Sequence, residues 1–455
     1  MTEFFGTDGV RGLVGDDLTV EMAYVLGRAA VLALGPNILI GRDTRASGPL
    51  LEDALARGIA DAGGTASCAG VVPTPAVAML TREYRLDGGV VVSASHNPPE
   101  YNGIKFFDAH GFKLTPAAQD TLEAALVAHA QGSSNYIDAA GQAVAGASPK
   151  GQKRELAQAA DDYCDLVCQQ AEGEGVGLAG IKVALDCGHG AAAETSPQVL
   201  RRLGAQVAAI NTDYDGQNIN VGCGSTNLEP LKQLVLDTQA DVGFAHDGDA
   251  DRVLAVDAQG NEVDGDFIEL ICALDLKRRG RLAKDTMVIT VMANLGLVKA
   301  AEEQQIGLVQ TAVGDSSVLA AMREGGYVLG GEPSGHTIFL EKNSTGDGLV
   351  TAVQLLAAMV RAGAPLAELA KVMRKYPQVL LNVPVRDKHA VEGHPQLLEA
   401  LHEAEGGLAG NGRILLRPSG TEALFRVMVE AASDELANAT AEKLAAVVRD
   451  IGGSA

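Results

Sequence analysis

The sequence predicts an α/β protein with three similar α/β domains of mixed, mostly parallel sheets and a smaller C-terminal α+β domain. Three observations lead to this prediction. A chain of 455 residues is too long for one ordinary hydrophobic core. Segments of strand and helix length alternate along most of it, and polar loops follow the strands. After Tyr376-Pro377 the strands and helices continue without long crossover segments, which is typical of a small α+β domain.

The first predicted domain covers residues 1–150. Its apolar runs end in loops that contain proline or several polar residues, as expected at the ends of strands. We expect strands at 38–41, 65–71, 90–92 and 104–107, and helices at 20–33, 49–62, 76–82 and 116–130. A stretch rich in Gly, Ser and Ala at 131–149 is predicted to be a linker.

The other predicted domains cover residues 151–252, 253–372 and 373–455. For the second we expect helices at 153–171 and 191–203 and strands at 181–185, 206–210 and 242–245. For the third we expect strands at 253–256, 287–291 and 308–311 and a helix at 297–304. For the fourth we expect strands at 378–385, 413–417 and 424–430 and helices near 395–404 and at 434–448.

Composition favours a small anionic ligand over a large partner. The formal net charge of −22 argues against nucleic acid or an anionic membrane as partner. Against this acidic background, arginines stand in polar loops, where bidentate cations bind small anions: Arg11, Arg42, Arg45, Arg252, Arg417 and Arg426. The six scattered cysteines indicate neither a zinc site nor a disulfide framework. Without a signal-like or membrane-spanning segment, we expect a cytoplasmic protein.

The loop after the apolar run at 90–92 carries the first candidate chemistry. It reads Ser-Ala-Ser-His-Asn-Pro-Pro and places a hydroxyl at Ser95, an imidazole at His96 and a cation nearby at Lys105. Two prolines stop both strand and helix, so we expect an ordered loop at a strand's carboxyl end, where open α/β sheets bind ligands. Alone it could be a capped turn or suggest a serine hydrolase, but the chain has no G-x-S-x-G elbow.

The segment Asp247-Gly248-Asp249-Ala250-Asp251-Arg252 gives the strongest single signal. Its three carboxylates alternate, so an extended chain would point them the same way, and such close like charges require a cation. An EF-hand loop is excluded, because its sixth and twelfth positions would be Arg252 and Ala258. The apolar flanks place the segment between buried strands, which disfavours a solvated acidic turn. We therefore predict a Mg²⁺ site completed by a substrate phosphate.

Three further segments are weaker signals. The loop at 330–336 offers a carboxylate and hydroxyl that suit sugar hydroxyls, although a plain turn is equally consistent. The segment Arg417-Pro418-Ser419-Gly420-Thr421 together with Arg426 has the composition of a phosphate-binding loop. Residues 188–193 match G-x-G-x-x-A, with Asp213 near the ribose-binding distance, yet we favour tight strand-to-helix packing over a dinucleotide site. No Walker A sequence is present.

Taken in order, these segments resemble the motifs of the α-D-phosphohexomutase family. The resemblance runs nearly end to end and rests on FGTDGVRG, GRDTRASG, SASHNP with NGIKFF, NINVGCGSTN, DGDADR, VMANLGLVKA, GGEPSGH, NSTGDG and RPSGTE with FRVMVE. The opening octet and the segments at 218–227, 291–300 and 343–348 further resemble the branch that acts on glucosamine phosphates.

The resemblance implies four domains around a central active-site cleft and an isomerase activity. The implied reaction interconverts glucosamine 6-phosphate and glucosamine 1-phosphate through a 1,6-bisphosphate, on the route to UDP-N-acetylglucosamine. One Mg²⁺ per subunit and a hexosamine or glucose 1,6-bisphosphate as activator are implied as well. The implied partner is a small hexosamine phosphate, and a homodimer is left open.

The resemblance also implies roles for individual residues. Ser95 would be carried as a phosphoserine, and Mg²⁺ would be bound by the Ser95 phosphate, Asp247, Asp249 and Asp251. The groups lining the transferring phosphoryl would be Arg11, His96, Lys105 and Arg252. Glu332 and Ser334 would hold sugar hydroxyls. The non-reacting phosphate would be bound by Arg417, Ser419, Gly420, Thr421 and Arg426.

The chain departs from the amino-sugar branch at several positions, among them Asn227, Ser316, Pro333 and Ala423. None of these belongs to the phosphoryl-transfer groups, so the departures concern the choice of sugar. A phosphomannomutase/phosphoglucomutase remains an alternative within the class. A metal-dependent sugar-phosphate phosphatase is an alternative from another class.

Overall fold

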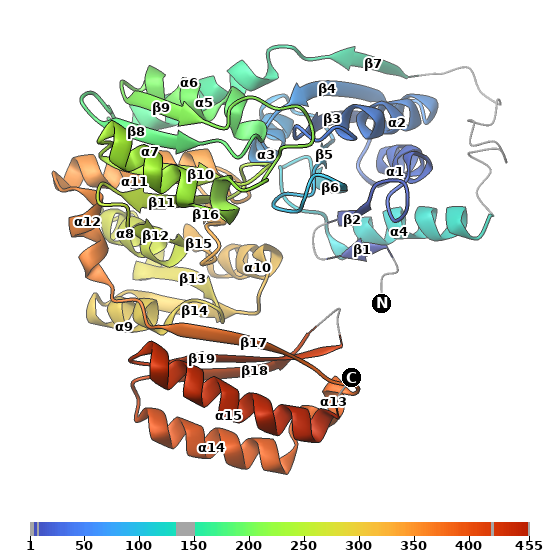
Figure 1. Ribbon diagram of the computed structural model, residues 1–455. Helices are drawn as coiled ribbons and strands as arrows, with labels where there is room; N and C mark the ends of the chain where they lie inside the picture. Colours follow the sequence, from blue (N-terminus) through green and yellow to red (C-terminus); the bar gives the residue numbers. More distant parts are fainter. Residues whose placement is uncertain (1–3, 7–8, 133–150, 420–422, 454–455) are drawn as a thin grey trace. The chain divides into compact units, whose positions relative to one another are not determined.

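The computed structural model describes residues 4–6, 9–132, 151–419 and 423–453 (Figure 1). The predicted linker at 131–149 therefore lies almost wholly outside the described residues. The chain forms two compact units. The first contains Met1–Met292 and Ile306–Lys371, and the second contains Ala293–Gln305 and Val372–Ala455.

The first sheet of the first unit has seven strands in the order β1-β2-β6-β5-β3-β4-β7. The strands are β1 (Phe5–Gly6), β2 (Gly9–Leu13), β3 (Asn37–Arg42), β4 (Thr65–Val71), β5 (Gly88–Val92), β6 (Tyr101–Asp108) and β7 (Gln152–Glu155). The helices are α1 (Val20–Ala33), α2 (Gly48–Asp61), α3 (Thr74–Glu83) and α4 (Pro116–Ala130). Apolar side chains of α1, α2 and α4 form one core with β3 and β5. In this spatial order, neighbouring strands from β1 to β5 pair antiparallel, and those from β5 to β7 pair in parallel.

The second sheet has five strands in the order β12-β11-β10-β8-β9. Its elements are α5 (Ala159–Gly173), β8 (Lys182–Asp186), α6 (Ser196–Arg202), β9 (Gln206–Ile210), α7 (Glu229–Thr238), β10 (Val242–His246), β11 (Val253–Asp257) and β12 (Glu262–Val263). Because β10 and β11 pair antiparallel, this sheet continues past residue 252, where the sequence suggested a domain boundary. The tight connection between β10 and β11 is the aspartate-rich segment.

The third sheet has four strands in the order β14-β13-β15-β16 and is again mixed. Its elements are α8 (Gly265–Arg278), β13 (Thr286–Thr290), β14 (Gly307–Thr311), α10 (Asp315–Gly325), β15 (Leu329–Gly331), β16 (Thr337–Phe339), α11 (Gly348–Ala362) and α12 (Leu366–Leu369). Met322 and Val318 of α10 pack against Val288 and Ile338 of the sheet. The loop with Glu332 and Ser334 joins β15 to β16.

The second unit is an α+β fold. Its three strands are antiparallel in the order β17-β19-β18. Its elements are α9 (Leu295–Glu303), β17 (Gln378–Pro384), α13 (Lys388–Val391), α14 (Pro395–Leu408), β18 (Arg413–Pro418), β19 (Leu424–Glu430) and α15 (Asp434–Gly452). Apolar residues of α14 and α15 cover the sheet, so the amphipathic segments found in the sequence form the core. The predicted fold class, three mixed α/β domains and one α+β domain, is confirmed.

Two predicted elements were wrong in detail. The helix expected at 153–171 begins only at Ala159, because the exposed segment Gln152–Glu155 pairs in parallel with β4 as an edge strand. The helix expected at 191–203 is split into a 3₁₀ turn (Ala191–Glu194) and α6, with Pro197 in the first turn of α6.

Among the described residues, no single helix is long and apolar enough to cross a bilayer. One sharply bent pair, Gly348–Ala362 with Leu366–Val372, meets the length and composition criteria only when its two parts are taken together.

Candidate active site

Ser95 lies at the carboxyl end of β5 in a strained backbone conformation. Its φ is +51°, a left-handed value that a residue with a side chain adopts at a cost of order 1–3 kcal/mol. The residue is 2% exposed, and its hydroxyl donates a 2.6 Å hydrogen bond to Oδ2 of Asp247. The same Oγ lies 3.3 Å from Nδ1 of His96. The nucleophile candidate is therefore held against the aspartate-rich segment by its own side chain.

The three aspartates converge because their loop turns, not because it is extended. Ala250 has φ +56°, and its amide bonds to the carbonyl of Asp247, 3.1 Å away. One carboxylate oxygen from each of Asp247, Asp249 and Asp251 lies within 4.8 Å of the others, and all three residues are buried. The predicted convergence is present, but the predicted extended chain was the wrong reason for it.

Lysine and threonine side chains from the first sheet's domain support the triad. Lys105 Nζ lies 2.9 Å from Asp249 Oδ2 and 3.6 Å from Asp251 Oδ2. Thr74, the first residue of α3, donates its hydroxyl to Asp249 Oδ2 at 2.6 Å and its amide to the Asp249 carbonyl at 2.9 Å. The metal-ligand candidates on β10–β11 are thus held by residues of another domain within the same unit.

Burial and neighbouring charges shift the pKa values of two of the triad's carboxyl groups in opposite directions. Burial, followed by the charges of Asp251 and Asp249, raises the pKa of Asp247 well above its usual range. Burial also opposes ionisation of Asp251, but Lys105 and His336 outweigh it and hold its pKa well below the usual range.

Two buried carboxylate oxygens, Asp249 Oδ1 and Asp251 Oδ1, have no hydrogen-bond partner in the described part of the chain. Asp251 Oδ1 lies 3.8 Å from Arg252 Nε, an ion pair longer than a hydrogen bond. Carboxylate oxygens are the ligands that Mg²⁺ prefers, so the donor set fits this ion.

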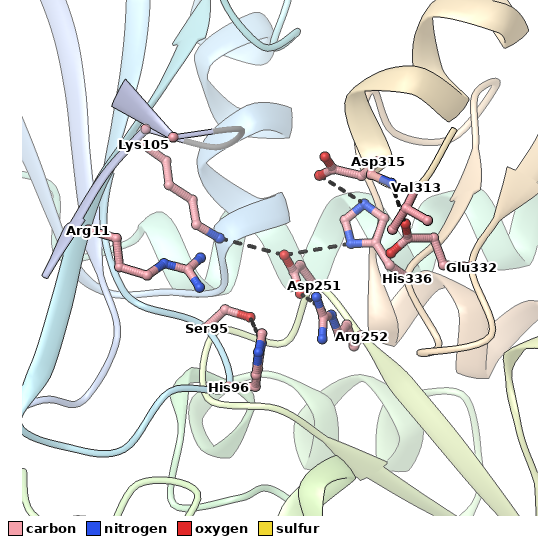
Figure 2. Close-up of a pocket in the computed structure, with 13 residues that line it drawn as sticks. Arg11, Ser95, His96, Lys105, Asp251, Arg252, Val313, Asp315, Glu332 and His336 are labelled. Atoms are coloured by element: carbon pink, nitrogen blue, oxygen red, sulfur yellow. Dashed lines mark hydrogen bonds and ion pairs between the residues drawn. The ribbon is translucent and has the colours of Figure 1, made fainter. Parts of the chain in front are cut away.

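A cavity of about 370 Å³ opens beside Ser95 and Asp251 (Figure 2). It lies within the first unit, and residues from all three of its sheets line it. Its lining residues are Gly6, Gly9, Arg11, Ser95, His96, Lys105, Asp251, Arg252, Val313, Gly314, Asp315, Glu332 and His336. The cavity thus brings together all four predicted phosphoryl-lining residues, Ser95 and the sugar-loop residue Glu332. Asp247 and Asp249 are fully buried behind it.

His96 and Arg11 face this cavity with different charges. Burial and the nearby guanidinium groups of Arg252 and Arg11 lower the pKa of His96 to about 4. The imidazole is therefore neutral near pH 7 and can accept a proton close to Ser95 Oγ. Arg11 donates from Nη1 to the side-chain oxygen of Asn97 at 3.1 Å, which holds its cationic end at the nucleophile loop.

His336 was missed as a site residue, although it ends the quoted motif GGEPSGH. Its Nδ1 lies 3.6 Å from Asp251 Oδ2, and its Nε2 lies 3.6 Å from Asp315 Oδ2 (Figure 2). Burial alone would lower the pKa of His336, but the two carboxylates raise it above the usual value. Spacing along the sequence could not have found Asp315, because it reaches this cluster from α10.

The sugar-loop candidates lie on the turn between β15 and β16. Glu332 accepts the amide of Gly314 at 3.0 Å through Oε1 and the hydroxyl of Ser334 at 3.3 Å through Oε2. Ser334 is not among the cavity-lining residues. The carboxylate of Glu332 is therefore fixed at the cavity wall by groups on both sides.

Two of the loop arginines do not bind a ligand in the way the sequence suggested. Arg42 pairs with Glu52 at 2.9 Å, and Arg45 is fully buried beside Asp43. Neither lines the cavity: Arg45 is fully buried, and Arg42 is partly buried in its ion pair with Glu52.

The phosphate-loop candidates belong to the second unit. Arg417 and Arg426 are directly opposite each other on the antiparallel strands β18 and β19. Burial and the charge of Arg426 lower the pKa of Arg417, as expected for two guanidinium groups that together attract an anion. Ser419 is buried at the end of β18, whereas Gly420 and Thr421 lie outside the described residues.

The G-x-G-x-x-A segment is explained by packing. A Cβ on Gly190 would lie 2.4 Å from the carbonyl oxygen of Gly248, so the backbone of the aspartate loop passes directly over this glycine. His189 Nδ1 lies 2.5 Å from the backbone oxygen of Asp213. These contacts support the packing interpretation over a dinucleotide site.

Profiles of four protein domains match the chain in order. They are the phosphoglucomutase/phosphomannomutase α/β/α domains I, II and III and the C-terminal domain, at residues 2–132, 161–260, 264–376 and 380–447. The chain belongs to the phosphoglucomutase/phosphomannomutase family. Its activity is accordingly that of an isomerase that transfers a phosphoryl group within a sugar phosphate.

Relatives and solved structures agree with this family. A phosphoglucosamine mutase of Desulforudis audaxviator is 48% identical over 99% of both chains. A phosphoglucomutase/phosphomannomutase family protein of Burkholderia thailandensis has the same fold, with a TM-score of 0.78, 24% identity and coverage of 100% and 99%. Aspergillus fumigatus N-acetylphosphoglucosamine mutase, solved in complex with GlcNAc-6P and magnesium, gives a TM-score of 0.64 at 20% identity, with coverage of 99% and 96%.

Proposed function

We propose that this family member is a phosphoglucosamine mutase that interconverts glucosamine 6-phosphate and glucosamine 1-phosphate, on the route to UDP-N-acetylglucosamine. The observation that carries the proposal is the 2.6 Å hydrogen bond from the Ser95 hydroxyl to Asp247, within a buried aspartate triad beside a cavity that Arg11, Lys105 and Arg252 help to line. The choice of glucosamine is supported by relatives of that name at 48% and 46% identity.

In the proposed mechanism Ser95 is carried as a phosphoserine. Its phosphoryl passes to the free hydroxyl of the bound sugar phosphate, which gives a 1,6-bisphosphate. This intermediate reorients, and its other phosphoryl returns to Ser95 Oγ. A hexosamine or glucose 1,6-bisphosphate would therefore act as activator by restoring the phosphoserine.

Charge and position do most of the catalytic work in phosphoryl transfer. Asp247, Asp249, Asp251 and the Ser95 phosphate would hold Mg²⁺, which supplies positive charge next to the transferring group. Arg11, Lys105 and Arg252 line the same cavity and add to that charge. His96, neutral near pH 7, is placed to take or return the proton of the reacting hydroxyl.

Separate groups of residues are proposed for the sugar hydroxyls and for the non-reacting phosphate. Glu332 and Ser334 would bind sugar hydroxyls, and Glu332 already forms part of the cavity wall. The non-reacting phosphate would be bound by Arg417, Ser419, Gly420, Thr421 and Arg426. The facing pair Arg417 and Arg426 offers two guanidinium forks, which suit a phosphate dianion.

The test is Ser95→Ala. We expect mutase turnover to be lost while glucosamine 6-phosphate still binds, because the substituted atom reacts but does not bind the sugar. Intact-mass analysis of the wild type should show one phosphate on the Ser95 peptide. Appreciable turnover by Ser95→Ala would refute the proposal.

Two alternatives have distinct outcomes. Comparing rates on glucosamine, mannose and glucose phosphates separates an amino-sugar mutase from a phosphomannomutase/phosphoglucomutase. Measuring inorganic phosphate during turnover separates a mutase, which releases none, from a phosphatase, in which water takes the phosphoryl of Ser95.

A further inference from the structure

Arg45 is a fully buried arginine whose five N–H groups are all occupied by acceptors. Its Nε donates to Asp43 Oδ2 at 2.9 Å. The other donors bond to four backbone carbonyls, those of Ser95 (3.0 Å), Asn97 (2.8 Å), Pro98 and Tyr101 (2.9 Å). Since guanidinium has five N–H donors, none is left for a ligand.

All four carbonyls belong to the segment that carries the nucleophile. The chain leaves β5 after Val92, passes Ser95 and two prolines, and enters β6 at Tyr101. The carbonyl dipoles of this segment converge on one cation in the interior. Their negative ends are thereby directed away from the cavity in which a phosphate would sit, and charge-assisted hydrogen bonds of this kind are stronger than neutral ones.

A second chain of hydrogen bonds leads from Arg45 to the amide of Ser95. Asp43 accepts from the Arg45 amide at 3.0 Å and from the Ser93 hydroxyl at 2.6 Å. Ser93 Oγ in turn accepts the Ser95 amide at 2.9 Å. One buried network therefore holds both the carbonyl and the amide of Ser95. Ser95 itself has φ +51°.

We propose that Arg45, acting with Asp43 and Ser93, is a positioning group that holds Ser95 in its strained conformation for phosphoryl transfer. The proposal rests on the phosphoserine function proposed above. It assigns no contact between Arg45 and substrate, since Arg45 is fully buried and does not line the cavity. Its effect must therefore appear in the rate of transfer and not in sugar binding.

The test uses Arg45→Lys and Ser93→Ala. Lysine keeps the charge but cannot reach all five acceptors. We expect kcat to fall about 100-fold, because a displacement of the reacting Ser95 oxygen by about 1 Å has a cost of this size. Ser93→Ala removes one hydroxyl and should lower kcat about tenfold. KM for glucosamine 6-phosphate should change less than about twofold in both, because ground-state contacts are intact.

A direct readout follows the chemical step itself. Dephosphorylated full-length enzyme is mixed with Mg²⁺ and glucose 1,6-bisphosphate, and phosphoryl uptake on Ser95 is timed by intact mass. In this step the bond from phosphorus to the sugar oxygen breaks, the bond to Ser95 Oγ forms, and the serine proton passes to the sugar oxygen. Uptake should slow by the same factors as kcat.

Two control variants separate positioning from loss of stability. Leu126→Ala opens a cavity in the same domain's core and lowers stability at α4, which packs against α1. Arg154→Lys makes the same exchange at an exposed arginine on β7 that bonds to Ser67 at 2.8 Å. Both should retain uptake within about threefold of wild type when assayed well below their unfolding temperatures.

Each outcome decides something. Slow uptake in Arg45→Lys and Ser93→Ala with unchanged KM and normal controls supports the proposal. If Arg45→Lys does not fold, the rate of phosphoryl uptake by Ser93→Ala alone tests the proposal. Uptake by Ser93→Ala at the rate of Leu126→Ala, or a raised KM with unchanged kcat, overturns it. Absence of uptake in the wild type refutes the phosphoserine function and, with it, this inference.

Discussion

Replacing Thr74 by valine should weaken Mg²⁺ binding while the fold is kept. Thr74 is 2% exposed, and its hydroxyl donates a 2.6 Å hydrogen bond to Asp249 Oδ2. Valine has nearly the same shape but no donor. A hydrogen bond to a charged group contributes about 1.5–3 kcal/mol. Because about 1.4 kcal/mol corresponds to tenfold in an equilibrium constant, the Kd for Mg²⁺ should rise about 10- to 100-fold. Groups that hydrogen-bond to metal ligands generally affect metal affinity by about the same factor.

The same helix supplies a matched control, Thr81→Val. Thr81 is fully buried in α3, and its hydroxyl has no hydrogen-bond partner among the residues that the structure describes. Removing that hydroxyl should leave Mg²⁺ affinity unchanged and the unfolding temperature equal or higher.

The assay titrates Mg²⁺ into EDTA-treated protein and follows the rise in unfolding temperature, which reports binding to the folded state. The Mg²⁺ concentration for half-maximal mutase activity gives a second measure. If Thr74→Val binds Mg²⁺ as tightly as Thr81→Val, the hydrogen bond from Thr74 does not support the metal site, and the reasoning is refuted.

Two further predictions concern buried carboxyl groups away from the metal. Burial and the charges of Asp266 and Glu332 raise the pKa of Glu269 well above its usual range, so its ionised form destabilises the folded state at high pH. This cost disappears as the pH falls below the folded-state pKa of Glu269. The unfolding temperature of Glu269→Gln should therefore exceed that of wild type most near pH 8 and little near pH 5. Unfolding temperatures that differ by the same amount at every pH would contradict this. Arg413→Met should lower the free energy of unfolding by about 2 kcal/mol in a urea titration, because it removes the Nε donor 3.0 Å from the buried Glu430 carboxylate, whose pKa burial already raises, and an unchanged midpoint would count against it.

The fold was predictable where the hydrophobic periodicity was strong and turn-forming or polar residues marked the ends of the elements. Strands such as β5 and β10 are short apolar runs that end in polar loops, and helices such as α2 and α15 have one apolar face. The helix α11 was not predicted from the sequence, although most of its residues are buried. The strand β7 is exposed and polar, and only its pairing with β4 makes it a strand.

The candidate site residues that were predictable are those that stand in short contiguous motifs. Ser95, the three aspartates and Glu332 all stand in short segments whose composition already indicates a function. Thr74 and Asp315 could not be found in this way, since each acts through a partner distant in the sequence. Arg45 was noticed but misread, because an arginine in a polar loop indicates an anion site until its burial is known.

Backbone packing explains why the nucleophile and the metal loop stay together although they belong to different sheets. A Cβ on Gly248 would lie 2.8 Å from the carbonyl oxygen of Ser95, so a side chain at this position would push the two loops apart. Asn220 adds a hydrogen bond from Nδ2 to the same carbonyl at 2.9 Å. The Ser95 carbonyl is thus held by Arg45 from the first domain and by Asn220 from the second.

The departures from the amino-sugar pattern fall outside this packed pair of loops. Pro333 lies on the β15–β16 turn, where its carbonyl accepts the amide of Gly265 at 3.2 Å. The same turn also contacts the aspartate loop, because the carbonyl of Gly335 accepts the amide of Val253 at 3.1 Å and His336 Nδ1 lies 3.6 Å from Asp251 Oδ2. A substitution at Pro333 is therefore expected to affect the β15–β16 turn and, through His336, the position of Asp251 as well.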